Sequence, residues 1–148
     1  MKKLFALGIM IIMFTAVGFS QSSATASAAA TIFTPISITK APGGDLNFGI
    51  MASSGTAGTC VLPPAGLRTV TGGVTLMGGA PQPATFTVTG ITDANYSITL
   101  PSSATTVSDG TNTMTINTWT SDHTGQITGG SITLHVGATL NVGALQPA

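Results

Sequence analysis

The stretch that decides the fold is Thr85-Phe86-Thr87-Val88-Thr89, in which threonine alternates with an apolar residue. Successive side chains of a β-strand point to opposite faces of the sheet, so this alternation predicts a strand with one solvent-exposed face and one buried face. Threonine is a good strand residue for the solvent-exposed face because its branched β-carbon fits the pleated backbone. The same period of two recurs at residues 96–100, 113–117 and 132–136.

Turn-forming sequences separate these stretches. Clusters rich in Gly, Pro, Asn and Asp occur at residues 41–45, 63–66, 78–81 and 108–111, and an Asx-type turn is expected at 93–95. We expect about seven to nine short strands between residues 31 and 143 and no helix, which is typical of an antiparallel β-sandwich. Pro35 predicts that the first strand, residues 32–39, lies at a sheet edge or switches sheets at this residue, because proline donates no ladder hydrogen bond. Gly137 is expected to form a kink between two strands.

Charge is nearly absent from the chain. Among 148 residues, four are Lys or Arg and four are Asp, while 26 are Thr and 19 are Gly. A helical bundle or coiled coil is excluded because it needs many Glu, Lys, Leu and Ala at helical spacing, and Glu is absent. A nucleic-acid binder is excluded because only two basic side chains follow Lys3, too few to neutralise phosphates. A disulfide-stapled small domain is excluded because Cys60 is the sole cysteine.

The N-terminal residues have the three parts of a secretory signal peptide. Lys2 and Lys3 form a basic start, residues 4–19 form an uncharged apolar run, and the following residues are rich in Ser and Ala. Cleavage after Ala26 or Ala28 fits the preference for small residues around the cut. We expect residues 1–28 to be the signal peptide and 29–148 to be one domain, secreted or located at the cell surface or in the periplasm. The alternative is a transmembrane anchor, since the 16-residue run is near the lower limit for crossing a bilayer.

Few side chains offer catalytic or zinc-binding chemistry. Cys60 has no cationic neighbour in sequence that would lower the pKa of its thiol, so we expect it to pack in the core. An interchain disulfide is the alternative for this residue, because export exposes the chain to an oxidising space. Ser121, Asp122 and His123 are the residue types of a hydrolase triad, but adjacent residues do not readily adopt its geometry. His135 alternates with apolar neighbours and is expected on the polar face of its strand, so the two histidines predict no zinc site.

Calcium binding and sugar stacking are also disfavoured. Residues 93–95 and 109–112 carry oxygen ligands, but too few for a calcium loop, so they predict turns. Trp119 and Tyr96 are expected to pack in the core or at a strand edge, because so few aromatic residues form no stacking stripe. The sequence therefore predicts no catalytic, cofactor-binding or metal-binding residue, no cofactor and no enzyme activity.

Six short motifs, in order along the chain, carry a family resemblance. They are residues 34–39 (TPISIT), 45–49 (DLNFG), 72–76 (GGVTL), 86–90 (FTVTG), 96–101 (YSITLP) and 140–143 (LNVG). Together they resemble the DUF4402 family of secreted bacterial proteins, over residues 29–148. This family is similar in pattern to spore coat protein U and fimbrial-subunit domains, so the resemblance implies an immunoglobulin-like sandwich that polymerises by passing strands between subunits. No function is assigned to the family, and the resemblance informs the fold more than the activity.

The C-terminal end departs from the family pattern. Family members continue past the Leu-Asn-Val-Gly motif with a Gly-x-Tyr-x-Gly segment and a final strand, whereas this chain stops at Ala148. One interpretation is a truncated or partial sequence. The other is a subunit that lacks its last strand and receives one from a neighbour by β-addition.

The low charge and the resemblance together predict a secreted, non-enzymatic structural protein that self-assembles into a coat or a pilus-like polymer. The expected self-association surfaces are the edge strand 32–39 and the C-terminal end 140–148. The alternative is an adhesin-like module that binds glycan or a host surface through loops 101–111 and 121–130, beside Trp119. We expect no nucleic-acid partner and, after signal cleavage, no membrane partner.

Overall fold

The computed structural model describes residues 22–123 and 125–146. The basic start at Lys2 and Lys3 and the apolar run 4–19 lie outside the described residues. Residues 22–36 have no regular secondary structure and are exposed, and this stretch contains both expected cleavage sites. Residues 1–32 and 33–148 form two separate units, and the fold described below belongs to the second.

The described part of the domain has seven β-strands. They are β1 (Ser37–Lys40), β2 (Ile50–Leu62), β3 (Thr69–Gly78), β4 (Ala84–Thr89), β5 (Thr105–Ser108), β6 (Thr113–Ser121) and β7 (Ser131–Val142). All of their pairings are antiparallel, which confirms the expected all-β class. In the part of the chain that the structure describes, we find no helix with the length and apolar character needed to cross a membrane.

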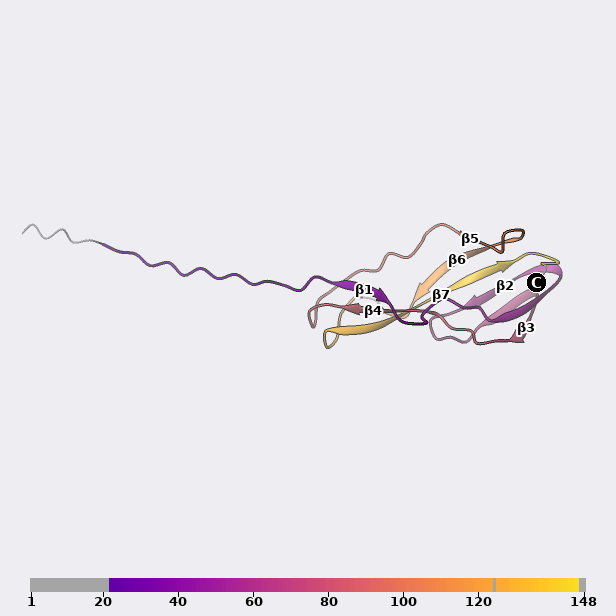
Figure 1. Ribbon diagram of the computed structural model, residues 1–148, viewed down its shortest axis with the longest axis horizontal. Helices are drawn as coiled ribbons and strands as arrows, with labels where there is room; N and C mark the ends of the chain where they lie inside the picture. The colour runs from indigo at the N-terminus through magenta and orange to yellow at the C-terminus, as the bar shows by residue number, and fades with distance from the viewer. Residues whose placement is uncertain (1–21, 124, 147–148) are drawn as a thin grey trace, which may run out of the picture. The chain divides into compact units, whose positions relative to one another are not determined.

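Strand β7 is the centre of the sheet (Figure 1). Its first half pairs with β4 and its second half pairs with β2. Val136 is paired with both Ala84 of β4 and Ser121 of β6, so β6 lies on the edge of β7 opposite β4. The remaining strands β1, β3 and β5 add to β4, β2 and β6 respectively. Three strands that are distant in sequence therefore depend on β7 as their common neighbour.

Gly137 marks the point where β7 passes from its β4 half to its β2 half. The prediction of two strands joined at this residue is wrong, because β7 continues through Gly137 as one strand. Glycine is needed here for another reason, which is the close approach of the chain that follows β2. A β-carbon at Gly137 would overlap the carbonyl oxygen of Leu62 and lie 2.7 Å from the carbonyl carbon of Pro63.

The inner face of the sheet encloses two apolar clusters, which gives the domain a sandwich-like core. The even-numbered residues of β7, from Ile132 to Val142, are buried on this face. The first cluster joins the second half of β7 to residues of β2, β3 and β6. The second cluster joins the first half of β7 to β4, to Ile127 and to apolar residues of the chain between β4 and β5. Leu46 and Trp119 pack against both clusters, so the two parts of the core are continuous.

A β-bulge in β6 turns Trp119 toward the core. The pairing of β6 with β7 shifts by one residue between Asn117 and Thr120, so that two residues of β6 lie opposite one residue of β7. Thr118 has a φ of 50°, a left-handed conformation that a β-branched residue rarely adopts. In a regular strand, Trp119 and Ile116 would face opposite sides of the sheet, whereas the bulge brings both against the first cluster.

One predicted strand forms no ladder. The alternation over residues 96–100 predicted a strand, but residues 97–104 make no main-chain hydrogen bond with the rest of the described chain. The side chains nevertheless alternate as expected: Ile98 and Leu100 pack against the second cluster, whereas Ser97 and Thr99 are exposed. The pattern thus predicted the two faces of this segment correctly and its pairing wrongly.

Candidate functional site

The edge of the sheet at β1 exposes apolar side chains. Within the described residues β1 pairs with β4 alone, so it lies at a sheet edge as expected. The predicted bounds of this strand, 32–39, are wrong at its start, because β1 begins at Ser37 and Pro35 lies outside the ladder. Ile38 is paired with Val88, so the two side chains lie on the same, inner face. Val88 is 3% exposed, whereas Ile38 is 57% exposed, and Ile36 before it is also exposed. The inner face of the sheet is therefore uncovered at β1.

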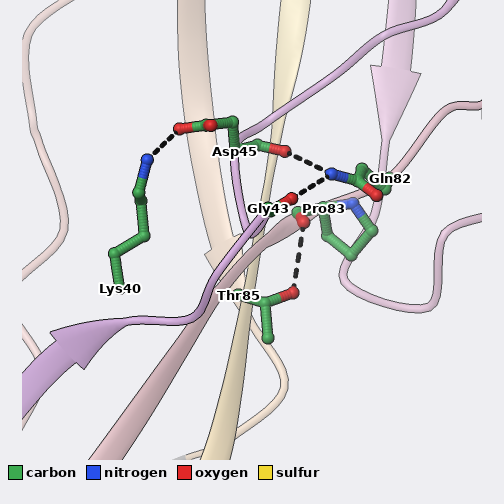
Figure 2. A network of polar contacts seen from close by, with 6 residues as sticks. All are labelled: Lys40, Gly43, Asp45, Gln82, Pro83 and Thr85. Atoms are coloured by element: carbon green, nitrogen blue, oxygen red, sulfur yellow. Dashed lines mark hydrogen bonds and ion pairs between the residues drawn. The ribbon is translucent and has the colours of Figure 1, made fainter.

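A network of polar contacts holds the chain that follows β1 (Figure 2). Gln82, just before β4, donates from Nε2 to the main-chain oxygens of Gly43 at 2.6 Å and Asp45 at 3.2 Å. Lys40 forms an exposed ion pair with Asp45, a kind of contact that contributes little stability. A lysine at an edge strand also discourages pairing with another chain. This protection is confined to one end of the edge, because residues 32–39 carry no charge.

The β5–β6 hairpin extends into a longer two-stranded ribbon, which is formed by the chain before β5 and the chain after β6. The middle of this ribbon is not paired. At one end Asn95 pairs with Gln126, and at the other end Thr105 pairs with Ile116. Thr105 lies ten positions after Asn95, and Gln126 lies ten positions after Ile116. The two paired ends therefore have the same register. We call residues 97–104, which lie between the two paired ends, the unpaired segment.

The unpaired segment leaves a long open edge. Among the described strands β5 pairs with β6 alone, so the edge of β5 away from β6 is also free. An unpaired edge therefore runs from residue 97 to residue 108. Rows of free N–H and C=O groups along an extended chain are a template for pairing with another strand.

Asp122 and His135 form a hydrogen-bonded pair that the sequence did not predict. Asp122 Oδ1 accepts a hydrogen bond from the His135 main-chain N–H at 2.8 Å, and Oδ2 lies 2.6 Å from His135 Nδ1. Burial opposes ionisation of Asp122, but the hydrogen bonds from His135 and the charge of its ring outweigh burial and lower the carboxyl pKa. The pair lies beside an open groove of about 560 Å³, which Pro64 and Thr85 also line.

This pair does not include the neighbouring residues of the Ser121-Asp122-His123 sequence. Asp122 contacts His135 of the adjacent strand, and Ser121 Oγ donates to the main-chain oxygen of His123 at 3.4 Å. The three consecutive residues therefore do not form the relay of a hydrolase triad. His135 lies between buried Leu134 and Val136 on the polar face of β7, as its alternation predicted.

Cys60 and the two largest aromatic residues belong to the core. Cys60 is buried in the first cluster, as predicted, and burial raises the pKa of its thiol. Tyr96 packs against the second cluster and Trp119 against both. The Trp119 Nε1 atom is itself buried, so this donor is not accessible to a ligand.

Asp109 forms the turn that the sequence predicted. Its Oδ1 accepts hydrogen bonds from the main-chain N–H groups of Thr111 at 2.8 Å and Asn112 at 2.6 Å. Hydrogen bonds from the main chain and side chain of Asn112, together with the Thr111 N–H, lower the Asp109 pKa to about 2. Among the residues that the structure describes, no group of three His, Cys, Asp or Glu side chains is placed to bind a metal ion.

The C-terminal end, residues 140–148, is the second expected self-association surface, and its first residues are already paired within the sheet. Residues 140–142 belong to β7, where Asn141 is paired with β2 on one edge and with β6 on the other. Beyond β7, the N–H of Leu145 donates to the carbonyl oxygen of Ser54 at 2.8 Å. Residues 147–148 lie outside the described residues. The described part of this end therefore offers no free edge to a second strand along residues 140–142.

Comparison with curated proteins and with solved structures finds no match to this chain. One family model, described as a domain of unknown function (DUF4402), matches residues 36–148. The matched region contains all seven strands and both core clusters. Since the match covers well over half of the chain, the protein belongs to the DUF4402 family.

Proposed function

We propose that this protein is a secreted, non-enzymatic structural protein whose copies assemble at the cell surface through β-strand addition, into a coat or a pilus-like polymer. The uncovered edge at β1 carries the proposal. Ile36 and Ile38 are 45% and 57% exposed in a segment that has no charged residue. Natural sheet edges are usually shortened, charged or covered, so an apolar, uncharged edge favours pairing with another chain.

The composition supports assembly more than catalysis. General acid–base chemistry would have to come from four Asp, two His and one Cys, and the Cys60 thiol is buried. The scarcity of charge lowers the repulsion between copies and so favours self-association. Export is supported by the sequence of residues 1–28, which has a basic start, an apolar run and small residues at the expected cleavage sites.

The test compares the oligomeric state of the exported wild-type protein with that of Ile38→Lys. Because Ile38 is more than half exposed, the lysine costs the monomer little buried apolar area but adds a charge to the edge. We expect the wild type to form high-molecular-weight assemblies in light scattering and filaments in electron microscopy, and the variant to stay monomeric. The intact mass of the exported protein reports whether cleavage follows Ala26 or Ala28.

The matched control is Leu67→Lys, which adds the same charge to an exposed leucine between β2 and β3. Its assembly should equal that of the wild type. If both lysine variants lose assembly equally, the effect belongs to charge in general and not to the β1 edge. Wild-type protein that remains monomeric at high concentration and forms no filaments refutes the proposed function.

A further inference from the structure

The unpaired segment, residues 97–104, has free main-chain groups although the ribbon is in register on both sides of it. Pro101 has no N–H, and the other seven N–H groups of the segment have no main-chain partner among the described residues. The segment is also uncharged. These are the properties of an acceptor for an added strand, in which main-chain hydrogen bonds provide affinity and alternate side chains provide specificity.

Ile98 and Leu100 determine how an added strand would lie. Both side chains pack against the second cluster, so the segment lies flat over the core. Its N–H and C=O groups then point sideways, along the plane of the layer. A strand bonded to these groups would extend the layer and turn every second side chain toward the same apolar core.

Residues 32–39 have the properties of the complementary donor, and we call them the edge segment. Ile32, Thr34, Ile36 and Ile38 repeat with the period of two and would share one face of a strand. The edge segment has the same length, eight residues, as the unpaired segment, and it is likewise uncharged. Its residues 32–36 have no main-chain partner among the described residues, and β1 has one free edge.

We infer that the unpaired segment of one copy accepts the edge segment of a second copy as an added strand. The inference rests on the proposed function and names the two surfaces that meet. The free edge of the edge segment bonds to the acceptor while β1 keeps its ladder with β4, so no native pairing is broken. Because donor and acceptor are different surfaces, the contact is heterologous, and it propagates as an open chain of copies unless the rotation between them closes a ring.

A photo-crosslinker at the donor identifies the acceptor without assuming a register. Phe33 is 69% exposed, so benzoylphenylalanine replaces it with little change to the monomer. We expect crosslinks between copies that peptide mass spectrometry maps to residues 97–108. The same probe at Leu67, which is exposed and belongs to neither segment, should give no such product. Crosslinks that map to β3, or that join residues of a single copy, overturn the inference.

Complementation between two assembly-blocked variants tests the pairing of the surfaces. Thr99→Pro removes an N–H that has no native main-chain partner, so the domain should keep its fold and lose roughly tenfold or more in self-affinity. Ile38→Lys blocks the donor and leaves the acceptor intact. At a concentration just sufficient for the wild type to assemble, each variant alone should be monomeric, and an equal mixture should form a one-to-one dimer that grows no further.

The outcomes separate the inference from the proposed function. If the wild type polymerises but the mixture stays monomeric, or if Thr99→Pro polymerises like the wild type, this pairing of surfaces is wrong while self-assembly stands. If the wild type does not assemble, the proposed function fails first. Thermal unfolding of Thr99→Pro verifies its fold, and the crosslinking result does not depend on that variant.

Discussion

Replacing Thr118 with glycine is expected to stabilise the domain, against the usual effect of glycine within a strand. Thr118 has a φ of 50°, and a left-handed conformation costs an L-residue about 1–2 kcal/mol. Glycine relieves this strain but adds freedom to the unfolded chain, at a cost of about 0.5–1 kcal/mol. The threonine side chain is exposed, and its hydroxyl makes only a 3.3 Å hydrogen bond to Asn117, so little else is lost. The net gain is about 0.5–1 kcal/mol in the free energy of unfolding.

Thermal unfolding followed by circular dichroism measures this gain. For a domain of this size, 1 kcal/mol corresponds to about 4 °C, so Tm should rise by roughly 2–4 °C. Thr120→Gly is the matched control, because Thr120 lies two residues further along β6, is exposed and has no positive φ. Glycine should lower Tm there. Equal losses of Tm in both variants would show that Thr118 is not strained and would refute the reasoning.

Two further predictions concern close packing and pH. Gly137→Ala should lower the free energy of unfolding by about 3 kcal/mol in urea titrations, because the new methyl group overlaps the main chain at Leu62 and Pro63. An unchanged urea midpoint would contradict the packing described at this position. Asp109 has a pKa lowered to about 2, so the stability that it contributes is present above about pH 4 and is lost as the pH falls toward 2. Asp109→Ala should remove this part of the pH dependence in urea unfolding at several pH values, and an identical pH profile would contradict it.

The sequence predicted the faces of the strands well, because alternation is a local property. Residues 85–89, 113–117 and 132–136 lie within β4, β6 and β7. In each strand the side chains of the apolar positions face the core clusters. The geometry of a single extended chain sends neighbouring side chains to opposite faces, so this information is contained in consecutive residues. The same holds for the turn at Asp109, whose hydrogen bonds reach no further than Asn112.

The strand with which each strand pairs could not be predicted in the same way, because the register of a pairing depends on residues far apart in the sequence. The alternation over residues 96–100 does not show that the ladder is interrupted there. The contact between Asp122 and His135 depends on the bulge at Thr118, which shifts the pairing of β6 with β7 by one residue. Without that shift Ser121 would lie opposite His135. A threonine gives no local signal of such a bulge, since glycine is the residue usually expected at positive φ.

The central position of β7 has a consequence for the order in which the chain can fold. Its partners β2, β4 and β6 all precede it in the sequence, so the pairings that close the sheet join residues far apart along the chain. Folds dominated by such contacts have high contact order and form slowly. Until residues 131–142 have left the ribosome, β4 and β2 lack their shared neighbour and neither cluster can close. Neither apolar cluster can therefore be completed before β7 is available to pair with β2, β4 and β6.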